Sequence, residues 1–309
     1  MKLTAVSRSM RDLLRQARRF AKVDATVLIT GETGVGKDGL ARLLHASGPR
    51  RREPFVTVDC PALPDTLVEA ELFGHERGAF TDATVARPGR FELAGRGTLY
   101  LDGVTRLSPN GQGALLRVVE ERRVTRLGGT TSSEIRARII ASSDTDMEDA
   151  VRDGSLRADL FHRLSVLPIR LPPLRERTEE ILPLARVFLS EVSERLDREP
   201  PRLAADAADA LVRYHWPGNI RELRHVLERV VLAGVGRELR ADALPIELLE
   251  GDEAYLAPGV GARPTLEDVE RRYIELTLSF ARGNQTRAAA ILGISRKALW
   301  EKRKRYGLR

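Results

Sequence analysis

The sequence predicts an α/β domain built around a parallel sheet, followed by a helical region and a small all-α domain. In the first half, short apolar runs alternate with helical patterns. These runs are nearly continuous in apolar residues, as strands buried on both faces of a parallel sheet tend to be. The strand pattern stops after Pro172-Pro173, and a compact helical segment closes the chain. We therefore expect a sheet with helices on both faces, and helical domains after it.

Residues 1–172 contain the strands and helices of the predicted sheet domain. The segment Met1–Phe20 is Arg-rich and amphipathic, and it lacks the uninterrupted apolar stretch of a signal peptide. Helices are expected at Lys37–Ala46 and Gln112–Glu121. The expected strands are Thr26–Ile29, Phe55–Val58, Thr98–Leu101, Ile139–Ala141 and Val166–Leu171.

Beyond residue 172 the pattern predicts helices alone. Residues 173–233 should form a small helical lid with helices at Glu179–Leu196, Ala205–Tyr214 and Asn219–Leu232. Residues 234–263 include Pro258 and Gly259 and have the composition of a linker. A compact helical domain is expected over residues 264–309.

Composition and charge narrow the classes of function. The single cysteine, Cys60, excludes a disulfide framework and suits a reducing cytoplasm, where we expect a buried, inert thiol. No apolar run is long enough for a membrane span, so no membrane partner is expected. Residues 264–309 hold 11 lysines and arginines against 5 acidic residues, whereas residues 1–263 carry a net charge of only +1. This concentration favours a nucleic acid partner over a merely solvated surface, and double-stranded DNA is the partner that we expect.

A phosphate-binding loop follows the first expected strand and opens a helix. The segment fits GxxxxGK, in the context that a true P-loop requires. Its glycines let backbone N–H groups close around phosphate oxygens, and Lys37 supplies a positive charge. The usual Ser or Thr ligand for magnesium is replaced by Asp38. The candidate ATP-binding residues here are Gly31, Glu32, Thr33, Gly34, Val35, Gly36, Lys37 and Asp38.

An apolar strand that ends in a carboxylate supplies the second part of the nucleotide site. Gly97–Asp102 has the pattern of a Walker B segment, and Asp102 can hold Mg²⁺ directly or through water. ATP and Mg²⁺ are therefore the expected cofactors.

The last helices predict a helix-turn-helix. Asn284 and Ser295 should cap helices Gln285–Leu292 and Arg296–Tyr306, with a tight turn at Gly293. Arg296 and Lys297 begin the second helix, where base edges are usually met, whereas the later cations should face phosphates. These later cations are Lys302, Arg303, Lys304 and Arg305. The expected core is Ala289, Ile291, Leu292, Ile294, Leu299 and Trp300, with a stacking platform as the alternative for Trp300.

The hexapeptide Gly78-Ala79-Phe80-Thr81-Asp82-Ala83 is typical of an exposed loop tip. It closely resembles the GAFTGA loop of bacterial sigma-54-dependent activators, which are enhancer-binding proteins of the AAA+ class. Three further segments resemble that family, in the family's order along essentially the whole chain. They are the loop leader Glu71–Glu76, the arginine-finger segment Leu156–Leu164 and the sensor II segment Tyr214–Leu223. The segment Asn284–Leu308 resembles the Fis-type DNA-binding domain of the same family.

The resemblance implies roles for particular residues. All six residues of the hexapeptide would contact sigma-54 holoenzyme, and Arg221 would reach the nucleotide from the lid. Arg157 and Arg163 would stabilise transferring charge on the ATP of a neighbouring subunit. The family assembles as a ring, usually a hexamer, and helix Thr265–Phe280 would pair two DNA-binding domains.

Several residues depart from the family pattern. Gly103 stands where the family has the Glu that activates the attacking water, and Asp59 stands where it has Asn. In addition, Ser143-Asp144 replaces Thr-Asn at sensor I, and Asp82 replaces a loop glycine. Either Asp59 replaces the missing base, or hydrolysis has decayed and nucleotide binding is retained. We expect impaired hydrolysis, since losing a general base costs roughly 10²–10⁴ in rate.

These features predict a sigma-54-type transcription regulator that binds an enhancer, forms a ring and uses ATP to press the Phe80 loop against sigma-54 RNA polymerase. One alternative is a DNA-binding regulator that binds nucleotide without useful turnover and acts by occupancy or in mixed rings. Another is a DNA-tethered AAA+ remodeller of a different partner. We expect no receiver or sensor domain before Met1, unless residues were removed there, and hence control by a partner protein, expression level or nucleotide.

Overall fold

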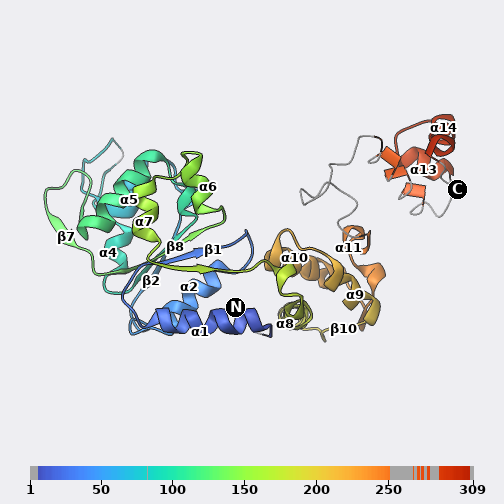
Figure 1. The fold of residues 1–309 in the computed structure, drawn as a ribbon, viewed down its shortest axis with the longest axis horizontal. Helices are drawn as coiled ribbons and strands as arrows, with labels where there is room; N and C mark the ends of the chain where they lie inside the picture. Colours follow the sequence, from blue (N-terminus) through green and yellow to red (C-terminus); the bar gives the residue numbers. More distant parts are fainter. Residues whose placement is uncertain are drawn as a thin grey trace. The chain divides into compact units, whose positions relative to one another are not determined.

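The computed structural model describes residues 6–81, 83–250, 267, 270, 271, 273, 274, 277, 278 and 285–306, without the side chains of residues 247, 250 and 290. The chain divides into two compact units. Figure 1 labels their helices and strands. The first contains residues up to Pro200 together with Trp216–Val231, and the second contains Pro201–His215 and the residues from Leu232 onward. Within the described part, no helix is both long and apolar enough to traverse a bilayer.

The first unit is built on a five-stranded sheet in which every neighbouring pair is parallel. The strand order is β2-β5-β8-β1-β9, so β1 lies between β8 and β9. The predicted α/β class is confirmed, and each expected strand is present with its ends within two residues of the predicted ones. The strands are β1 (Val27–Thr30), β2 (Phe55–Asp59), β5 (Thr98–Asp102), β8 (Arg138–Ser143) and β9 (Leu167–Arg170).

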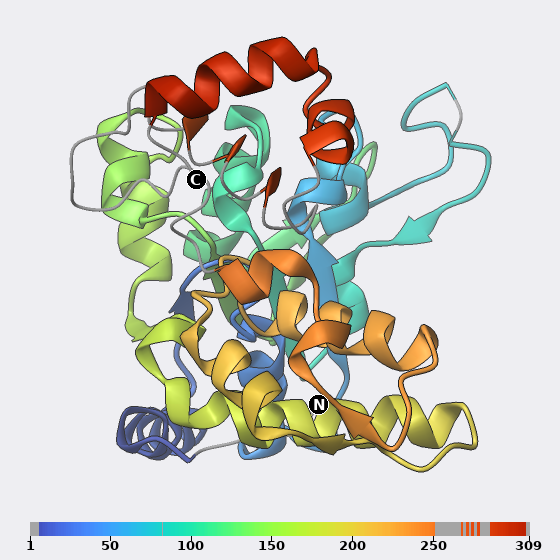
Figure 2. The ribbon, with the colours of Figure 1, turned by 90° about the vertical axis from the view of Figure 1, so that its right-hand side faces the viewer.

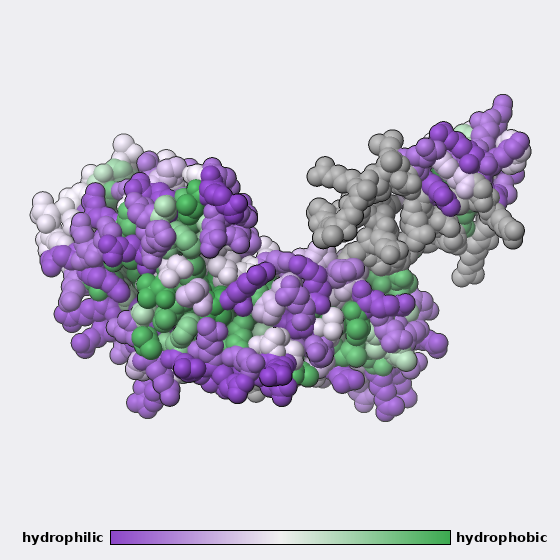
Figure 3. Space-filling model, viewed as in Figure 1, coloured by the Kyte–Doolittle hydropathy of each residue, from purple (hydrophilic) through white to green (hydrophobic). Residues whose placement is uncertain are grey.

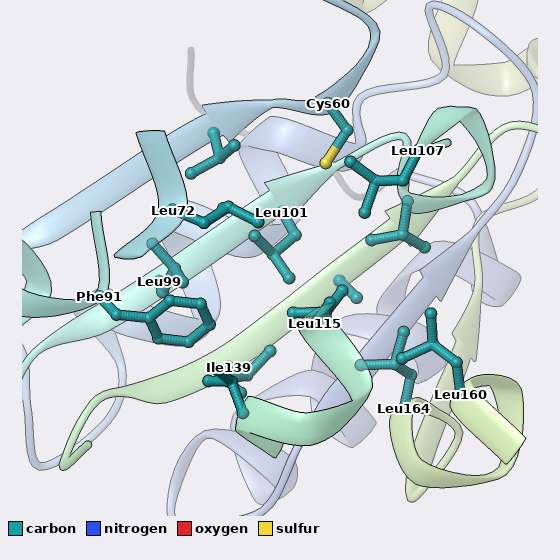
Figure 4. Packing of buried hydrophobic residues seen from close by; sticks show 14 of the residues in the cluster. Cys60, Leu72, Phe91, Leu99, Leu101, Leu107, Leu115, Ile139, Leu160 and Leu164 are labelled. Carbon is teal, nitrogen blue, oxygen red and sulfur yellow. The ribbon is translucent and has the colours of Figure 1, made fainter. Parts of the chain in front are cut away.

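Helices cover both faces of this sheet because its strands present apolar side chains on both sides. One cluster joins Leu99, Leu101 and Ile139 to residues of α5 and α7, such as Leu115 and Leu160 (Figure 4). A second cluster on the other face packs strand residues against α1 and α2. The helices of these layers are α1 (Arg8–Ala21), α2 (Lys37–Ala46), α3 (Val68–Phe73), α4 (Arg90–Ala94), α5 (Pro109–Glu121), α6 (Met147–Arg152) and α7 (Ala158–Leu164).

Short elements surround the sheet, and two longer helices complete the first unit. Antiparallel pairs join β3 (Gly74–His75) to β4 (Arg87–Pro88) and β6 (Arg123–Thr125) to β7 (Ser132–Glu134). The lid helices are α8 (Ile181–Arg195) and α10 (Asn219–Leu232). The 3-10 turns are η1 (Cys60–Ala62), η2 (Val104–Arg106), η3 (Leu174–Glu176) and η4 (Thr178–Glu180).

The second unit differs from the sequence expectation between residues 234 and 250. This stretch was expected to be linker, but it holds β11 (Glu238–Leu239), η5 (Ala241–Ala243) and α11 (Ile246–Glu250). β11 pairs in parallel with β10 (Arg202–Leu203), and α9 (Ala205–Arg213) packs against η5 and α11. The Gly- and Pro-rich composition that suggested a linker lies beyond residue 250, outside the described residues.

The helix-turn-helix is present as α13 (Gln285–Ile291) and α14 (Arg296–Tyr306). Gly293 makes the turn with φ +65°, and the Ser295 hydroxyl accepts a hydrogen bond from Ala298 N at 3.1 Å. Ala289 and Leu299 are buried as expected, but Ile291 and Trp300 were wrongly assigned to the core, since they are 42% and 56% exposed. Most of Thr265–Phe280 lies outside the described residues.

Candidate nucleotide-binding site

The P-loop connects β1 to α2 at the carboxyl edge of the sheet. The Lys37 ammonium donates to the carbonyl oxygens of Gly31 and Glu32, at 2.7 and 3.0 Å, so it is held inside the loop. Burial lowers the pKa of Lys37, although the carboxylates of Asp144 and Asp102 oppose that effect. Gly36 precedes the helix and has no side chain to cap it, which leaves the first N–H groups of α2 available to an anion.

Gly34 is required by the close approach of the lid. A Cβ at this position would lie 2.2 Å from the carbonyl oxygen of Gly218, a distance that no side chain tolerates. The N–H of Arg221 also donates to Gly34 O at 3.3 Å. The start of α10 is therefore seated directly on the phosphate-binding loop, which brings sensor II to the nucleotide site.

The Asp102 carboxylate is oriented by two hydroxyl groups. Ser142 Oγ on β8 donates to Asp102 Oδ1 at 2.5 Å, and Tyr100 Oη lies 3.0 Å from the same oxygen. Burial raises the pKa of Tyr100 far above its usual range, so the phenol stays neutral and can donate. A carboxylate fixed in this way, at the end of β5, is suited to hold Mg²⁺.

Gly103 follows Asp102 in the left-handed region, with φ +74° and ψ +47°. A Cβ built there would lie 3.0 Å from Cδ of Pro61. A glutamate therefore cannot simply be placed at position 103, because the left-handed backbone and the nearby Pro61 both disfavour any residue larger than glycine there.

Asp59 stands beside Asp102 across the β2–β5 pair, where the two are register partners at the ends of their strands. Its side chain is exposed and lines the same cleft as Lys37 and Asp102. Cys60 is buried next to it, and burial raises the pKa of its thiol to about 12, as expected for an inert cysteine.

Asp144, at sensor I, is a site residue whose contacts the sequence did not reveal. It accepts a hydrogen bond from Thr33 Oγ1 at 3.1 Å and lies 3.6 Å from the guanidinium of Arg106. Burial opposes its ionisation, but Thr33, Arg106 and Lys37 outweigh burial and lower the pKa of Asp144. The carboxylate is therefore ionised beside the P-loop, where the family pattern has a neutral Asn.

These groups line one cleft of about 880 Å³ between the P-loop and the lid helices α8 and α10. Arg221 lies on it, as the sensor II segment predicts. Other polar residues also line the cleft, and the sequence analysis did not predict them. Those on α10 could have been found from their spacing, because positions 221, 224, 225 and 228 share one face of the helix. The additional residues are Arg42, Arg106, Arg195, Arg224, His225 and Glu228.

The Glu32 side chain contacts protein groups rather than the cleft. It accepts hydrogen bonds from both terminal nitrogens of Arg175 and from Asn219 Nδ2 at 3.1 Å. The Arg175 hydrogen bond is the main cause of a lowered pKa at Glu32. Asn219 is fully buried and also binds Thr33 O and Leu174 N, so it ties the P-loop to η3 and α10.

The residues present fit a nucleotide with Mg²⁺. Lys37 and the free helix terminus suit phosphate, and Asp102 is a hydrogen-bonded carboxylate beside them. The described residues contain no group of three or more side chains able to hold a metal alone. The hydrogen-bonded carboxylate of Asp102 suits Mg²⁺, which usually takes one or two carboxylates and completes its shell with phosphate oxygens and water.

Arg157 and Arg163 do not line this cleft. Arg157 precedes α7 and pairs with Asp159 at 2.8 Å, while Arg163 pairs with Glu120 at 3.0 Å. Both pairs are well exposed, so they contribute little stability and are easily exchanged for another anion.

The described residues of the hexapeptide, 78–81 and 83, lie in a loop that extends away from the helices of the first unit (Figure 2). Gly78 N donates to Ala83 O at 2.8 Å, and Ala83 is buried. Phe80 is 37% exposed, and its ring meets the His75 ring edge-on with centroids 4.9 Å apart. Asp82 lies outside the described residues.

The candidate DNA-binding cations fall into two groups. Arg296, Lys297 and Lys304 are exposed, and Lys304 lies over the Trp300 ring. Lys302 pairs with Glu270, and Arg305 pairs with Glu267 at 2.8 Å. Arg303 is only partly exposed. Arg305 is exposed as well, but its guanidinium pairs with Glu267, so Arg296, Lys297 and Lys304 are better placed for DNA.

A P-loop, a Walker B carboxylate and a lid arginine around one cleft define a nucleotide-binding protein of the AAA+ class. Three family descriptions match the chain: "Sigma-54 interaction domain" over residues 3–170, "AAA+ ATPase lid domain" over 175–257, and "Bacterial regulatory protein, Fis family" over 265–306. The chain belongs to the sigma-54-dependent transcriptional regulators.

Individual relatives agree with this assignment. The chain is 40% identical to the transcriptional regulatory protein FlbD of Caulobacter vibrioides, covering 96% of this chain and 69% of FlbD. It is 42% identical to the nitric oxide reductase transcription regulator NorR2 of Cupriavidus necator, covering 97% of this chain but only 62% of NorR2. The crystal structure of NtrX from Brucella abortus in complex with ATP matches with a TM-score of 0.75 and 33% identity, covering 100% of this chain and 70% of NtrX.

Proposed function

We propose that this chain binds MgATP in the cleft, assembles into a ring, and uses ATP to press the Phe80 loop against sigma-54 RNA polymerase from an enhancer site. The observation that carries the proposal is the meeting of Lys37, Asp102 and Arg221 around one cleft, in a unit that also projects the Phe80 loop. The ATP complex of the related NtrX supports nucleotide binding.

In this proposal the P-loop N–H groups and Lys37 bind the phosphates, and Asp102 holds the Mg²⁺. The metal, when bound, neutralises phosphate charge during transfer. Arg221 contacts the nucleotide from the lid, so that its phosphate state is communicated to α10. The exposed pairs of Arg157 and Arg163 lie outside their own cleft, which supports a role at the nucleotide of an adjacent subunit.

Hydrolysis in this proposal is weak, because Gly103 offers no general base. Asp59 is the carboxylate best placed to replace it, since it is the register partner of Asp102 and lines the same cleft. ATP turnover by the wild type and by Asp59→Asn tests this role. A large loss in the variant supports Asp59 as the base, whereas equal and brisk turnover excludes both weak hydrolysis and the Asp59 role.

A second candidate function is a DNA-binding regulator that binds nucleotide without useful turnover. The left-handed backbone of Gly103 favours it, and so does the short distance from an added Cβ to Pro61, because both disfavour a glutamate at this position. ATP turnover separates the two candidates. Measurable turnover supports remodelling, and nucleotide binding without turnover supports action by occupancy.

A further inference from the structure

Six cations form a stripe along helix α1 and its C-cap residue, and none of them lines the nucleotide cleft. At 3.6 residues per turn, these six side chains fall within about 100° of the helix circumference. All six are exposed, whereas Met10, Leu14 and Ala17 on the opposite face are buried in the core of the first unit. The helix is therefore fixed with its cations outward. The stripe consists of Arg8, Arg11, Arg15, Arg18, Arg19 and Lys22.

Few acidic groups offset this charge. Asp12 is the only acidic residue of α1, and it pairs with Arg15. Within the described part of the chain, none of the other five cations forms an ion pair. Since residues 1–263 as a whole carry a net charge of only +1, the stripe is a local excess and not a consequence of average composition.

The cationic surface continues beyond the end of the helix. Arg51 and Arg52 are exposed in the turn after α2. This turn adjoins α1, because a Cβ on Gly48 would lie 2.7 Å from Ala21 O, and Arg50 pairs with Asp24 at 2.7 Å. Figure 3 shows hydrophilic side chains along the lower edge of the first unit, where Figure 1 places α1.

We propose that this face, the α1 stripe together with Arg51 and Arg52, binds the phosphate backbone of double-stranded DNA. A helix of 14 residues is about 21 Å long, and duplex DNA carries about one charge per 1.7 Å, so the stripe can follow several phosphates. The contact would carry no sequence information, since phosphates specify none. The proposal rests on the proposed DNA binding of α13 and α14, which would hold a duplex at high local concentration.

The test is binding of the full chain to a random-sequence duplex of about 30 base pairs, measured by fluorescence anisotropy over a range of NaCl concentrations. The variant Arg11→Gln/Arg18→Gln/Arg19→Gln keeps good helix formers at exposed positions. Its salt slope should be about 2.7 smaller than that of the wild type, or roughly 500-fold weaker binding near 0.1 M salt, if each lost cation contacts a phosphate. The control Arg186→Gln/Arg229→Gln/Arg237→Gln removes the same charge elsewhere and should change the slope by less than about 1.

If the salt slope of the α1 variant equals that of the wild type, or changes no more than that of the control, the inference is overturned. The same result is expected if this face binds an acidic protein instead of DNA. The variant Arg296→Gln/Lys297→Gln separates this failure from failure of the proposed function. If Arg296→Gln/Lys297→Gln weakens duplex binding while the α1 variant does not, only the proposed contact between α1 and DNA is refuted. If the wild type binds no duplex at all, the proposed DNA binding itself fails.

Discussion

Replacing Gly103 with glutamate restores the family residue, yet we expect it to destabilise the protein. A non-glycine residue in the left-handed region costs about 1–2 kcal/mol. The added Cβ also meets the Pro61 ring at 3.0 and 3.1 Å, and overpacking of that kind costs about 1–3 kcal/mol. The sum of about 2–5 kcal/mol corresponds to a Tm lower by roughly 4–20 °C for a domain of this size.

Thermal unfolding of four variants tests this reasoning. Gly103→Ala should lose nearly as much stability as Gly103→Glu, because both carry the Cβ and the strained backbone. Pro61→Ala/Gly103→Glu should recover part of the loss and should hydrolyse ATP faster than Gly103→Glu alone. Gly113 is the control, since it lies within α5 and a Cβ there meets nothing within 4 Å, so Gly113→Ala should not destabilise. A Gly103→Glu variant that melts within about 2 °C of the wild type would refute the strain argument.

Three further outcomes are expected. Asp59→Asn should lower steady-state ATP turnover roughly 10²–10⁴-fold if Asp59 is the general base, while nucleotide affinity measured by calorimetry stays near that of the wild type. Asn219→Ala should cost about 1–3 kcal/mol in urea unfolding, because it leaves the buried Leu174 N–H without its acceptor and removes the donor to Thr33 O; an unchanged midpoint would contradict this. The pKa of Glu32 is lowered in the folded state, so its stabilisation is present above the ordinary value of 4.5 and is lost as the pH falls through the folded-state pKa. Glu32→Gln should therefore be less stable than the wild type near neutral pH, by less than about 1 kcal/mol for so exposed a pair, and the two should converge in acid; a constant difference would exclude the linkage.

The sheet and its main helices could be predicted because their signals are local. β1, β5 and β8 are nearly continuous apolar runs, and helices Lys37–Ala46, Asn219–Leu232 and Arg296–Tyr306 have the predicted bounds. The short elements α11 and β11 were not predicted, since β11 exists only through pairing with a strand about 36 residues earlier.

Side-chain burial in the helix-turn-helix could be predicted only in part from the sequence. Trp300 and Ile291 are large and apolar, but α13 and α14 are short and leave them exposed. A small domain covers only part of its apolar surface, so residue type alone does not decide which side chains are buried.

Motifs in the sequence identified P-loop residues, Asp102 and Arg221, which line one cleft, whereas the hydrogen bonds that join these segments could not be predicted. Lys37 and Asp102 were assigned from their positions after strands. The bonds from Thr33 to Asp144 and from Asn219 to Glu32 join residues more than 100 positions apart, so no local pattern reveals them. The left-handed conformation of Gly103 could not be predicted from the sequence either, although it decides whether glutamate can be restored there.

The proposed function is that this chain uses ATP to act on sigma-54 RNA polymerase. Transcription from a sigma-54 promoter with purified components tests it, comparing ATP with a non-hydrolysable analogue. We expect transcript with ATP, none with the analogue, and none with ATP for Phe80→Ala. Equal output with ATP and with the analogue, or no transcript from a wild type that binds both ATP and sigma-54, would contradict it.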